Sequence, residues 1–189
     1  MTVEAEIARH DWGSLRNYAG RSEFLPAAVR RLCSATSAED ARFAFEAVDA
    51  ATVVQGRLSQ AAVAVASCLA YSLRHADAQA PAVPRILLML SIIAAGTDEW
   101  ADRDGVGPLD VSACMEHVLT GFSRYCELLE SSDDVEVVLS SIDLVCMCGT
   151  DDPALREPAR TALRAARLRQ LTPGVVVLVE NSLAELDGS

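Results

Sequence analysis

The sequence predicts an all-α fold, and three observations carry that prediction. Apolar residues recur at intervals of three and four along most of the 189 residues, which is the periodicity of an amphipathic helix. Hydrophobic residues make up 51% of the chain and aromatic residues only 5%, and this composition, rich in Ala, Val and Leu, favours helix packing over sheets. No segment has a convincing strand pattern. A chain of this length can bury a sizeable core, so we predict a single domain over 1–189.

Capping and helix-breaking residues divide the first half of the chain into helices. A short side chain with an oxygen caps a helix start, and Gly commonly ends a helix. The expected starts are Asp11, Ser22 and Ser37, and the expected ends are Gly20 and Gln55-Gly56. Segments 58–73 and 84–95 are apolar on most sides, so we expect them to be buried and residues 38–95 to form the core.

The second half begins with a segment rich in Gly and Asp, 96–109, which is the longest expected loop and the main break in the chain. A single apolar stripe then runs from Val111 to Leu129, and the stripe after it includes Leu139. The three helices that follow the first stripe are expected to start at Ser132, Pro153 and Thr172.

One run near the C-terminus has the pattern acid, Pro, x, apolar, Arg, x, x, Ala, x, x, x, Leu. It spans residues 152–163 and reads DPALREPARTAL. This pattern resembles the second-helix signature of a HEAT repeat, and weaker echoes of its acidic start stand at 40–42 and 133–135. Two residues depart from the family pattern, since Thr150 stands where a HEAT repeat often has Asp and Pro158 lies inside the helix. The resemblance implies stacked helical hairpins, which mostly present surfaces to other proteins.

Paired in order, the expected helices give hairpins that start near residues 24, 58, 110 and 152. The intervals of 34, 52 and 42 residues are irregular but near the ~40 to 47 of HEAT and armadillo arrays. We therefore expect an α-α superhelix of the HEAT or armadillo kind, a right-handed stack of about four helical hairpins.

Several residues in the N-terminal third follow a second, looser pattern. They are Asp11-Trp12, Leu15, Tyr18, Gly20, Leu25-Pro26, Gln55-Gly56 and Ala61-Ala62. This spacing is similar to that of small HEAT-like bacterial proteins. For such families the resemblance implies protein binding, in some cases the neutralisation of a cognate toxin.

Charge is concentrated in the middle of the chain. The formal net charge is −11, and residues 1–95 hold nine acids and nine Arg, which cancel. Residues 98–152 hold fourteen acids against two Arg. Such a surface repels nucleic acid and anionic lipid and attracts basic partners, so we expect no direct nucleic-acid binding and a basic protein as the partner.

A zinc site could be sought among Cys114, His117, Cys126, Cys146 and Cys148. Cys146 and Cys148 are two residues apart, about 200° around a helix, so both cannot reach one ion without unwinding it. Buried cysteines that act as small hydrophobic residues explain the pattern better. We expect no metal and no cofactor.

A calcium loop of the EF-hand type, counted from Asp102, has Asp104 at its third position and Gly107 at its sixth. It fails at the fifth position, which is Val106, and at the twelfth, which is Ala113. The better interpretation of this segment is an exposed acidic loop.

Catalytic patterns are scarce, and we expect no enzyme. The sequence contains no Gly-x-Ser-x-Gly, Walker, dinucleotide-binding or His-Glu-x-x-His motif. The histidines, His10, His75 and His117, lie on separate elements. The paired carboxylates at 133–134 and 151–152 stand where helices begin, so capping explains them.

Arg156, Arg160, Arg164 and Arg167 are spaced to line one face of a helix. They could bind an anion or a phosphate. The nearby excess of acids favours a structural interpretation, in which they pair with acids of adjacent helices.

No signal peptide is visible at the N-terminus, and the longest apolar run, 86–95, is about half of what a bilayer requires. We therefore expect a cytoplasmic protein that makes no membrane contact, with its six cysteines as thiols.

The predicted function is a non-enzymatic protein-interaction module that engages a basic protein, as an inhibitor or an immunity-type protein. The candidate partner-binding residues are Asp98, Glu99, Trp100, Asp102 and Asp104. The acids supply a localised field, and Trp100 is a candidate anchor. The alternative is a helical domain that binds a small molecule or a metal, with or without catalysis, and uses 96–109 as a lid.

Overall fold

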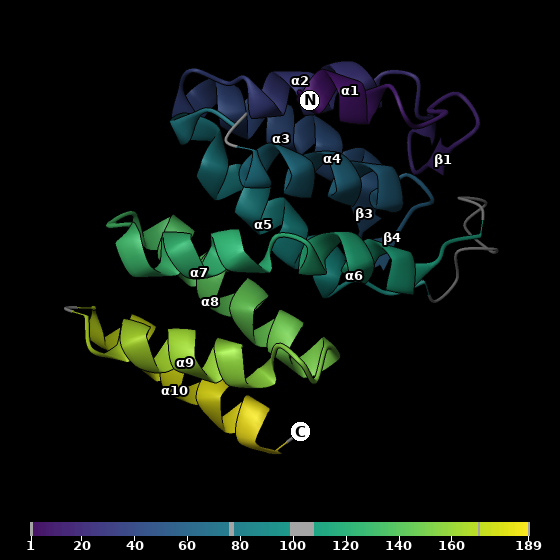
Figure 1. The fold of residues 1–189 in the computed structure, drawn as a ribbon. Coiled ribbons are helices and arrows are strands. Elements are labelled where there is room, and N and C mark those ends of the chain that lie inside the picture. The colour runs from purple at the N-terminus through teal and green to yellow at the C-terminus, as the bar shows by residue number, and fades with distance from the viewer. Residues whose placement is uncertain (1, 76–77, 99–107, 170, 189) are drawn as a thin grey trace. The chain divides into compact units, whose positions relative to one another are not determined.

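The computed structural model describes residues 2–75, 78–98, 108–169 and 171–188 (Figure 1). The prediction of an all-α protein is confirmed, since helix accounts for 69% of the structure and strand for 5%. The expected HEAT-like superhelix stays a prediction. None of the helices in the described ranges combines the length and the apolar character that crossing a bilayer requires.

The chain divides into two compact units, and each is described by itself. Unit 1 comprises Met1–Gly121 and unit 2 comprises Phe122–Ser189. The expectation that 1–189 behaves as one domain stays a prediction.

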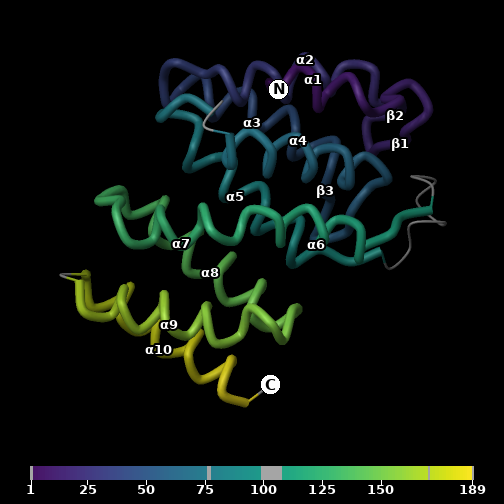
Figure 2. Tube along the Cα trace, viewed as in Figure 1, coloured from purple at the N-terminus to yellow at the C-terminus, as the bar shows by residue number. Residues whose placement is uncertain are grey.

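Unit 1 is built from helices that pack around a buried one (Figure 2). The described helices are α1 (Val3–Ile7), α2 (Leu25–Cys33), α3 (Ala38–Thr52), α4 (Ala62–Arg74), α5 (Val83–Ala94), α6 (Val111–Leu119) and a 3-10 turn (Ala80–Ala82). Helix α4 contacts α1, α2, α5 and α6, and α2 packs along α3. Every residue from Ala64 to Leu73 is buried, because the small side chains of α4 let helices approach on all sides. This confirms the expected burial of segment 58–73.

The helix expected at Asp11–Gly20 is wrong. Residues Arg16–Asn17 and Gly20–Arg21 form an antiparallel hairpin, β1–β2, and the first helix is α1 instead. The buried Asn17 side chain explains the difference, since its oxygen accepts a hydrogen bond from the amide of Ala19 at 2.7 Å and its nitrogen donates to Ser22 Oγ at 2.9 Å. Such local side-chain bonds offer the backbone an alternative to a helix.

Helix α3 ends at Thr52, before the expected break, and Gln55-Gly56 is the turn of a second hairpin. Strand β3 (Val53–Val54) pairs with β4 (Arg57–Leu58), and the two turn residues have φ angles of 54° and 77°. Both central residues with positive φ are typical of the tight turns that join two strands. Helix α3 therefore ends in a hairpin, and its start is the expected Ser37, whose hydroxyl accepts from the amide of Asp40 at 3.1 Å.

Unit 2 is a bundle of helices around α8. Its described helices are α7 (Phe122–Ser131), α8 (Val135–Asp151), α9 (Arg156–Arg167) and α10 (Pro173–Gly188). Helix α8 contacts the other three, and its buried face includes Val138, Ile142 and Val145. Leu139, expected on the core stripe, is half-buried, because it lies beside that face rather than on it.

Three predicted helix boundaries in the second half are wrong. The stripe expected from Val111 to Leu129 is two helices, because the chain breaks at Thr120-Gly121, where the Thr120 hydroxyl donates to the carbonyl of His117 at 2.6 Å. The cap of α8 is Asp134 and not Ser132, since Asp134 Oδ1 accepts from the amide of Glu136 at 2.9 Å.

The third boundary is the start of α9, which is Arg156 and not Pro153. Asp152 Oδ1 accepts from the amide of Ala154 at 2.8 Å, which closes a turn before the helix begins. Pro158 therefore lies in the first turn of α9, where its missing N–H removes no helical hydrogen bond. This explains how the run that resembles a HEAT signature accommodates its second proline.

Candidate functional site

The acidic segment predicted to bind a partner is described only at its edges. Asp98 is exposed, and Glu99, Trp100, Asp102 and Asp104 lie outside the described residues, as does the start of the calcium loop that was set aside. The prediction that these five residues form a partner-binding site therefore stays a prediction.

Both edges of this acidic segment are held by unit 1. On the N-terminal side, Thr97 continues beside the β3–β4 hairpin, where its amide donates to the carbonyl of Gly56 at 3.0 Å and its carbonyl accepts from the amide of Leu58 at 2.8 Å. On the C-terminal side, Asp110 caps α6 by accepting from the amide of Ala113 at 3.2 Å. The acidic residues are therefore joined to ordered backbone at Thr97 and at Asp110.

The cysteines considered as zinc ligands are divided between the units. Cys114 and His117 lie on α6 of unit 1, whereas Cys126, Cys146 and Cys148 lie on α7 and α8 of unit 2. Burial raises the pKa of Cys114 and Cys148 to about 12 and that of Cys126 and Cys146 to about 11. A metal binds the thiolate, which these environments disfavour. No cluster of three metal-binding side chains occurs among the described residues.

Two of the four arginines on the α9 face pair with acids of α10. Arg160 is 2.9 Å from Asp187 and donates to the carbonyl of Leu186 at 2.7 Å, and Arg167 is 2.9 Å from Glu180. For these two arginines the structural interpretation accounts for the contacts. The Arg167–Glu180 pair is exposed, and such a pair contributes ~0–1 kcal/mol.

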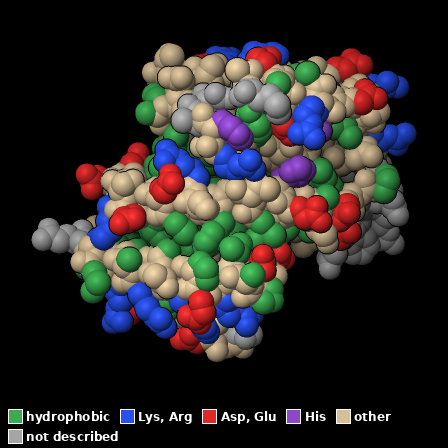
Figure 3. Space-filling model, in the orientation of Figure 1, with side chains coloured by type: hydrophobic (Ala, Val, Ile, Leu, Met, Phe, Trp, Pro, Cys, Tyr) green, Lys and Arg blue, Asp and Glu red, His purple; other side chains and the backbone are tan. Residues whose placement is uncertain are grey.

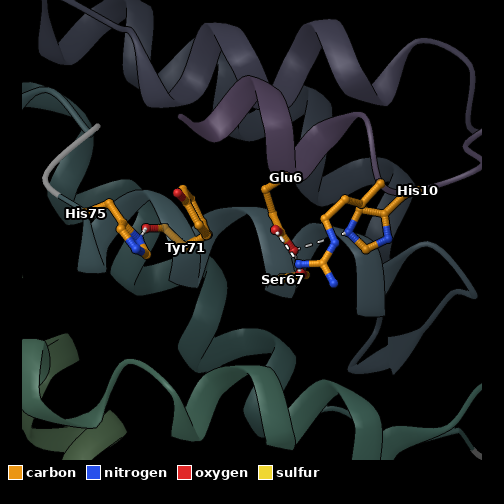
Figure 4. Close-up of polar contacts among 6 residues, drawn as sticks. Glu6, His10, Ser67, Tyr71 and His75 are labelled. Carbon is orange, nitrogen blue, oxygen red and sulfur yellow. Dashed lines mark hydrogen bonds and ion pairs between the residues drawn. The ribbon is translucent and has the colours of Figure 1, made fainter. Parts of the chain in front are cut away.

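A buried carboxylate lies in the contact between α1 and α4. Glu6 is only 5% exposed, and its two oxygens accept from Ser67 Oγ at 2.5 Å and from Arg9 Nη1 at 3.0 Å (Figure 4). Burial alone would raise the pKa of this carboxyl, but the hydrogen bonds from Ser67 and Arg9 outweigh it and hold the pKa below the usual 4.5. Glu6 is therefore an ionised, satisfied group that ties α1 to α4.

His10 lies beside this carboxylate, with its Nε2 3.9 Å from Glu6 Oε1 (Figure 4). Burial lowers the pKa of His10, and the opposing charge of Glu6 offsets only part of that effect. Its ring meets the ring of Trp12 edge-on, and Trp12 Nε1 donates to the carbonyl of Ile7 at 2.8 Å. The buried Nε2 of His10 has no hydrogen-bond partner among the described residues.

A cleft of about 370 Å³ opens next to Glu6. Its walls come from α1, from the C-terminal half of α4 and from the end of α6, and its lining residues are Glu6, Arg9, Ser67, Tyr71, Arg74, His75, His117 and Thr120. Histidine and arginine side chains are visible close together on this face of the molecule (Figure 3). Burial lowers the pKa of His117 as well.

One wall of the cleft is rigid. The rings of Tyr71 and His75 stack with centroids 3.9 Å apart and an angle of 14°, and His75 Nδ1 is 3.0 Å from the carbonyl of Tyr71 (Figure 4). With its Nδ1–H donating to this carbonyl, the neutral imidazole keeps Nε2 as an acceptor.

The Ser67 hydroxyl and the Glu6 carboxylate are already paired within the cleft. Ser67 donates to Glu6, and the Glu6 charge is balanced by Arg9. Besides these groups, the lining offers a ligand the guanidinium of Arg74.

Sequence reasoning missed this cleft. The three histidines do lie on separate elements, as expected, but His75 and His117 line the same cleft and His10 lies next to Glu6 at its edge. The decisive hydrogen bond joins residues 61 positions apart, Ser67 and Glu6. The one local signal is an acid next to the buried Ile7 within a short helix.

Comparison with known proteins adds no assignment. No family model matches the chain, and neither a curated protein nor a solved structure matches it.

Acid is expected to destabilise unit 1 in two pH windows. The pKa values of His10 and His117 lie below 6.5, so as pH falls below 6.5 the unfolded chain binds more protons than the folded one and stability decreases. The pKa of Glu6 lies below 4.5, so its contribution is present above that pH and is lost as pH falls through the folded value. The free energy of unfolding in urea, followed between pH 8 and pH 3, measures both decreases of stability.

NMR titration of the imidazole protons is the matched check on the first window. Midpoints of His10 and His117 at or above 6.5, or a stability that stays flat down to the range of Glu6, would contradict the assignment. In a Glu6→Gln variant, the decrease of stability at the lower pH, which comes from Glu6, should disappear. The decrease that begins below pH 6.5, which comes from the histidines, should remain.

Proposed function

We propose that the chain is a non-enzymatic, cytoplasmic protein-interaction module that binds a basic protein through an acidic surface, as an inhibitor or immunity-type protein. The observation that carries the proposal is the concentration of fourteen acids against two Arg in residues 98–152, in a chain whose first 95 residues are neutral. Solubility alone would be served by charge spread over the whole surface. A localised field instead speeds the capture of an oppositely charged partner.

The attachment of the acidic segment supports this proposal. Thr97 and Asp110 join it to the β3–β4 hairpin and to the start of α6, and Asp98 is exposed directly after the first of these contacts. A segment held at both ends loses less conformational freedom on binding than a free one. The helical hairpins that the resemblance to HEAT repeats implies are also typical scaffolds for partner proteins.

The partner complex should depend strongly on salt and on the acidic segment. Replacing Asp98, Glu99, Asp102 and Asp104 by Ser is expected to slow association about tenfold or more at low salt, because steering by a local field is lost. Surface plasmon resonance with a captured basic partner, at 20 and 500 mM NaCl, measures the effect.

A control variant separates the local field from total charge. Replacing Asp11, Glu23, Glu39 and Glu46 by Ser removes the same charge from exposed positions in the neutral first half. We expect this control to change association much less. Equal slowing by both variants would show that only net charge matters, and an unchanged rate in the acidic-segment variant would remove that segment from the interface.

A further inference from the structure

We propose that the cleft between α1, α4 and the end of α6 is a binding site for a small oxyanion, a phosphate or carboxylate group. None of its lining residues belongs to the acidic segment, and the cleft would take a small ligand rather than a protein. The cleft volume of about 370 Å³ lies within the ~300–1,000 Å³ typical of ligand pockets.

The charge balance of the cleft favours an anion. Its lining includes two arginines and two histidines against a single carboxylate, Glu6. That carboxylate is already neutralised by Arg9 at 3.0 Å and hydrogen-bonded by Ser67. The negative charge of Glu6 is therefore largely balanced within the protein. The remaining arginine, Arg74, gives the cleft a net positive charge.

Arg74 is the side chain most suited to bind the ligand. It stands at the last position of α4, is exposed, and makes no ion pair or hydrogen bond with any described side chain. A guanidinium matches a phosphate or carboxylate with two parallel hydrogen bonds. An arginine that lines a cleft and has no partner in the described part of the chain is thus available to a ligand of this chemistry.

Other polar groups line the open side of the cleft. The imidazoles of His75 and His117 lie there, and so does the Thr120 hydroxyl, whose proton is donated to the carbonyl of His117. Protonation turns both nitrogens of the His117 imidazole into donors, so the site should bind an oxyanion of constant charge more tightly as pH falls. The groups that face His117 are Glu6, Arg9 and His10 from the α1 region and Glu116 from its own helix.

The stacked pair of Tyr71 and His75 gives the site a fixed wall. Because the ring of His75 is held by the stack and by the carbonyl of Tyr71, its outward nitrogen is positioned before any ligand arrives. A preformed polar group loses little entropy when a ligand binds, which is the property expected of a binding site rather than of a chance surface hollow.

Isothermal titration calorimetry with inorganic phosphate, and separately with succinate, tests the proposal on the full chain at pH 6.0 and 8.0. We expect saturable binding of at least one of the two anions, and for succinate tighter binding at pH 6.0. Phosphate itself gains a proton between the two pH values, so no direction is expected for it. The two arms distinguish a phosphate ligand from a carboxylate ligand. No saturable binding of either anion at either pH would overturn the proposal.

Variants show whether the anion binds in this cleft. Arg74→Gln and His117→Gln should each weaken binding about tenfold, whereas Arg42→Gln, which removes the same charge from an exposed position on α3, should leave it unchanged. Circular dichroism melts of all three variants establish that they fold. Equal affinities in the Arg74→Gln and Arg42→Gln variants would place the anion elsewhere and overturn the assignment.

Discussion

Replacing Leu163 by Asp should destabilise unit 2 by about 5 kcal/mol or more, which is enough to unfold it. The side chain of Leu163 is 0% exposed on α9, a helix that contacts α7, α8 and α10. The substitution removes a buried leucine and leaves a carboxylate with no charge partner in its place. Urea unfolding followed by circular dichroism at 222 nm measures the loss.

Leu168 provides a matched control at the end of the same helix. It is 88% exposed, so Leu168→Asp should change the free energy of unfolding by less than about 0.5 kcal/mol. Comparable losses in the two variants would mean that the buried face of α9 is misassigned.

Replacing Gly96 by Val should destabilise unit 1 by about 2–3 kcal/mol. A Cβ atom at this position would lie 2.5 Å from both Cγ and Cδ2 of Leu58, whose side chain is fully buried. Cγ is not the free end of the side chain, so Leu58 cannot simply rotate away. Leu58 also donates its amide hydrogen to the carbonyl of Thr97. The strain therefore falls on the contact between Thr97 and the β3–β4 hairpin.

A double-mutant cycle with Leu58→Ala tests this cause. The single Leu58→Ala change should cost ~2–5 kcal/mol, and the double variant should cost clearly less than the sum of the two, because the smaller alanine makes room for the methyl groups of the valine introduced at Gly96. Gly174→Val is the control, since nothing lies within 4 Å of a Cβ there. Strict additivity would show that the Gly96 effect has another origin.

Local chemistry explains which parts of the fold were predictable. Ser37 starts α3 through a side-chain cap, and Gln55-Gly56 forms the positive-φ turn of the hairpin that follows the helix. Both features depend only on neighbouring residues. The errors have local and tertiary causes that apolar periodicity does not show. Asn17 diverts the backbone into a hairpin, and Thr120-Gly121 interrupts a continuous apolar stripe without a proline.

The candidate cleft was less predictable than the helices. Its lining joins residues from α1, α4 and α6, and its central carboxylate depends on the contact between Glu6 and Ser67. Separated in sequence, each of these residues looks like an ordinary surface or capping residue. Only the packing of a very short α1 on α4 gives them a common location.

Because most of its cysteines are buried, the alkylation rate of the native protein reports how often its structure opens. Five of the six free thiols are buried, and burial raises the pKa of Cys68, Cys114, Cys146 and Cys148, so alkylating reagents meet almost no thiolate in the closed state. Three cysteines belong to unit 1 and three to unit 2. The rate at which each buried thiol is alkylated therefore measures how often its own unit opens, without any engineered label.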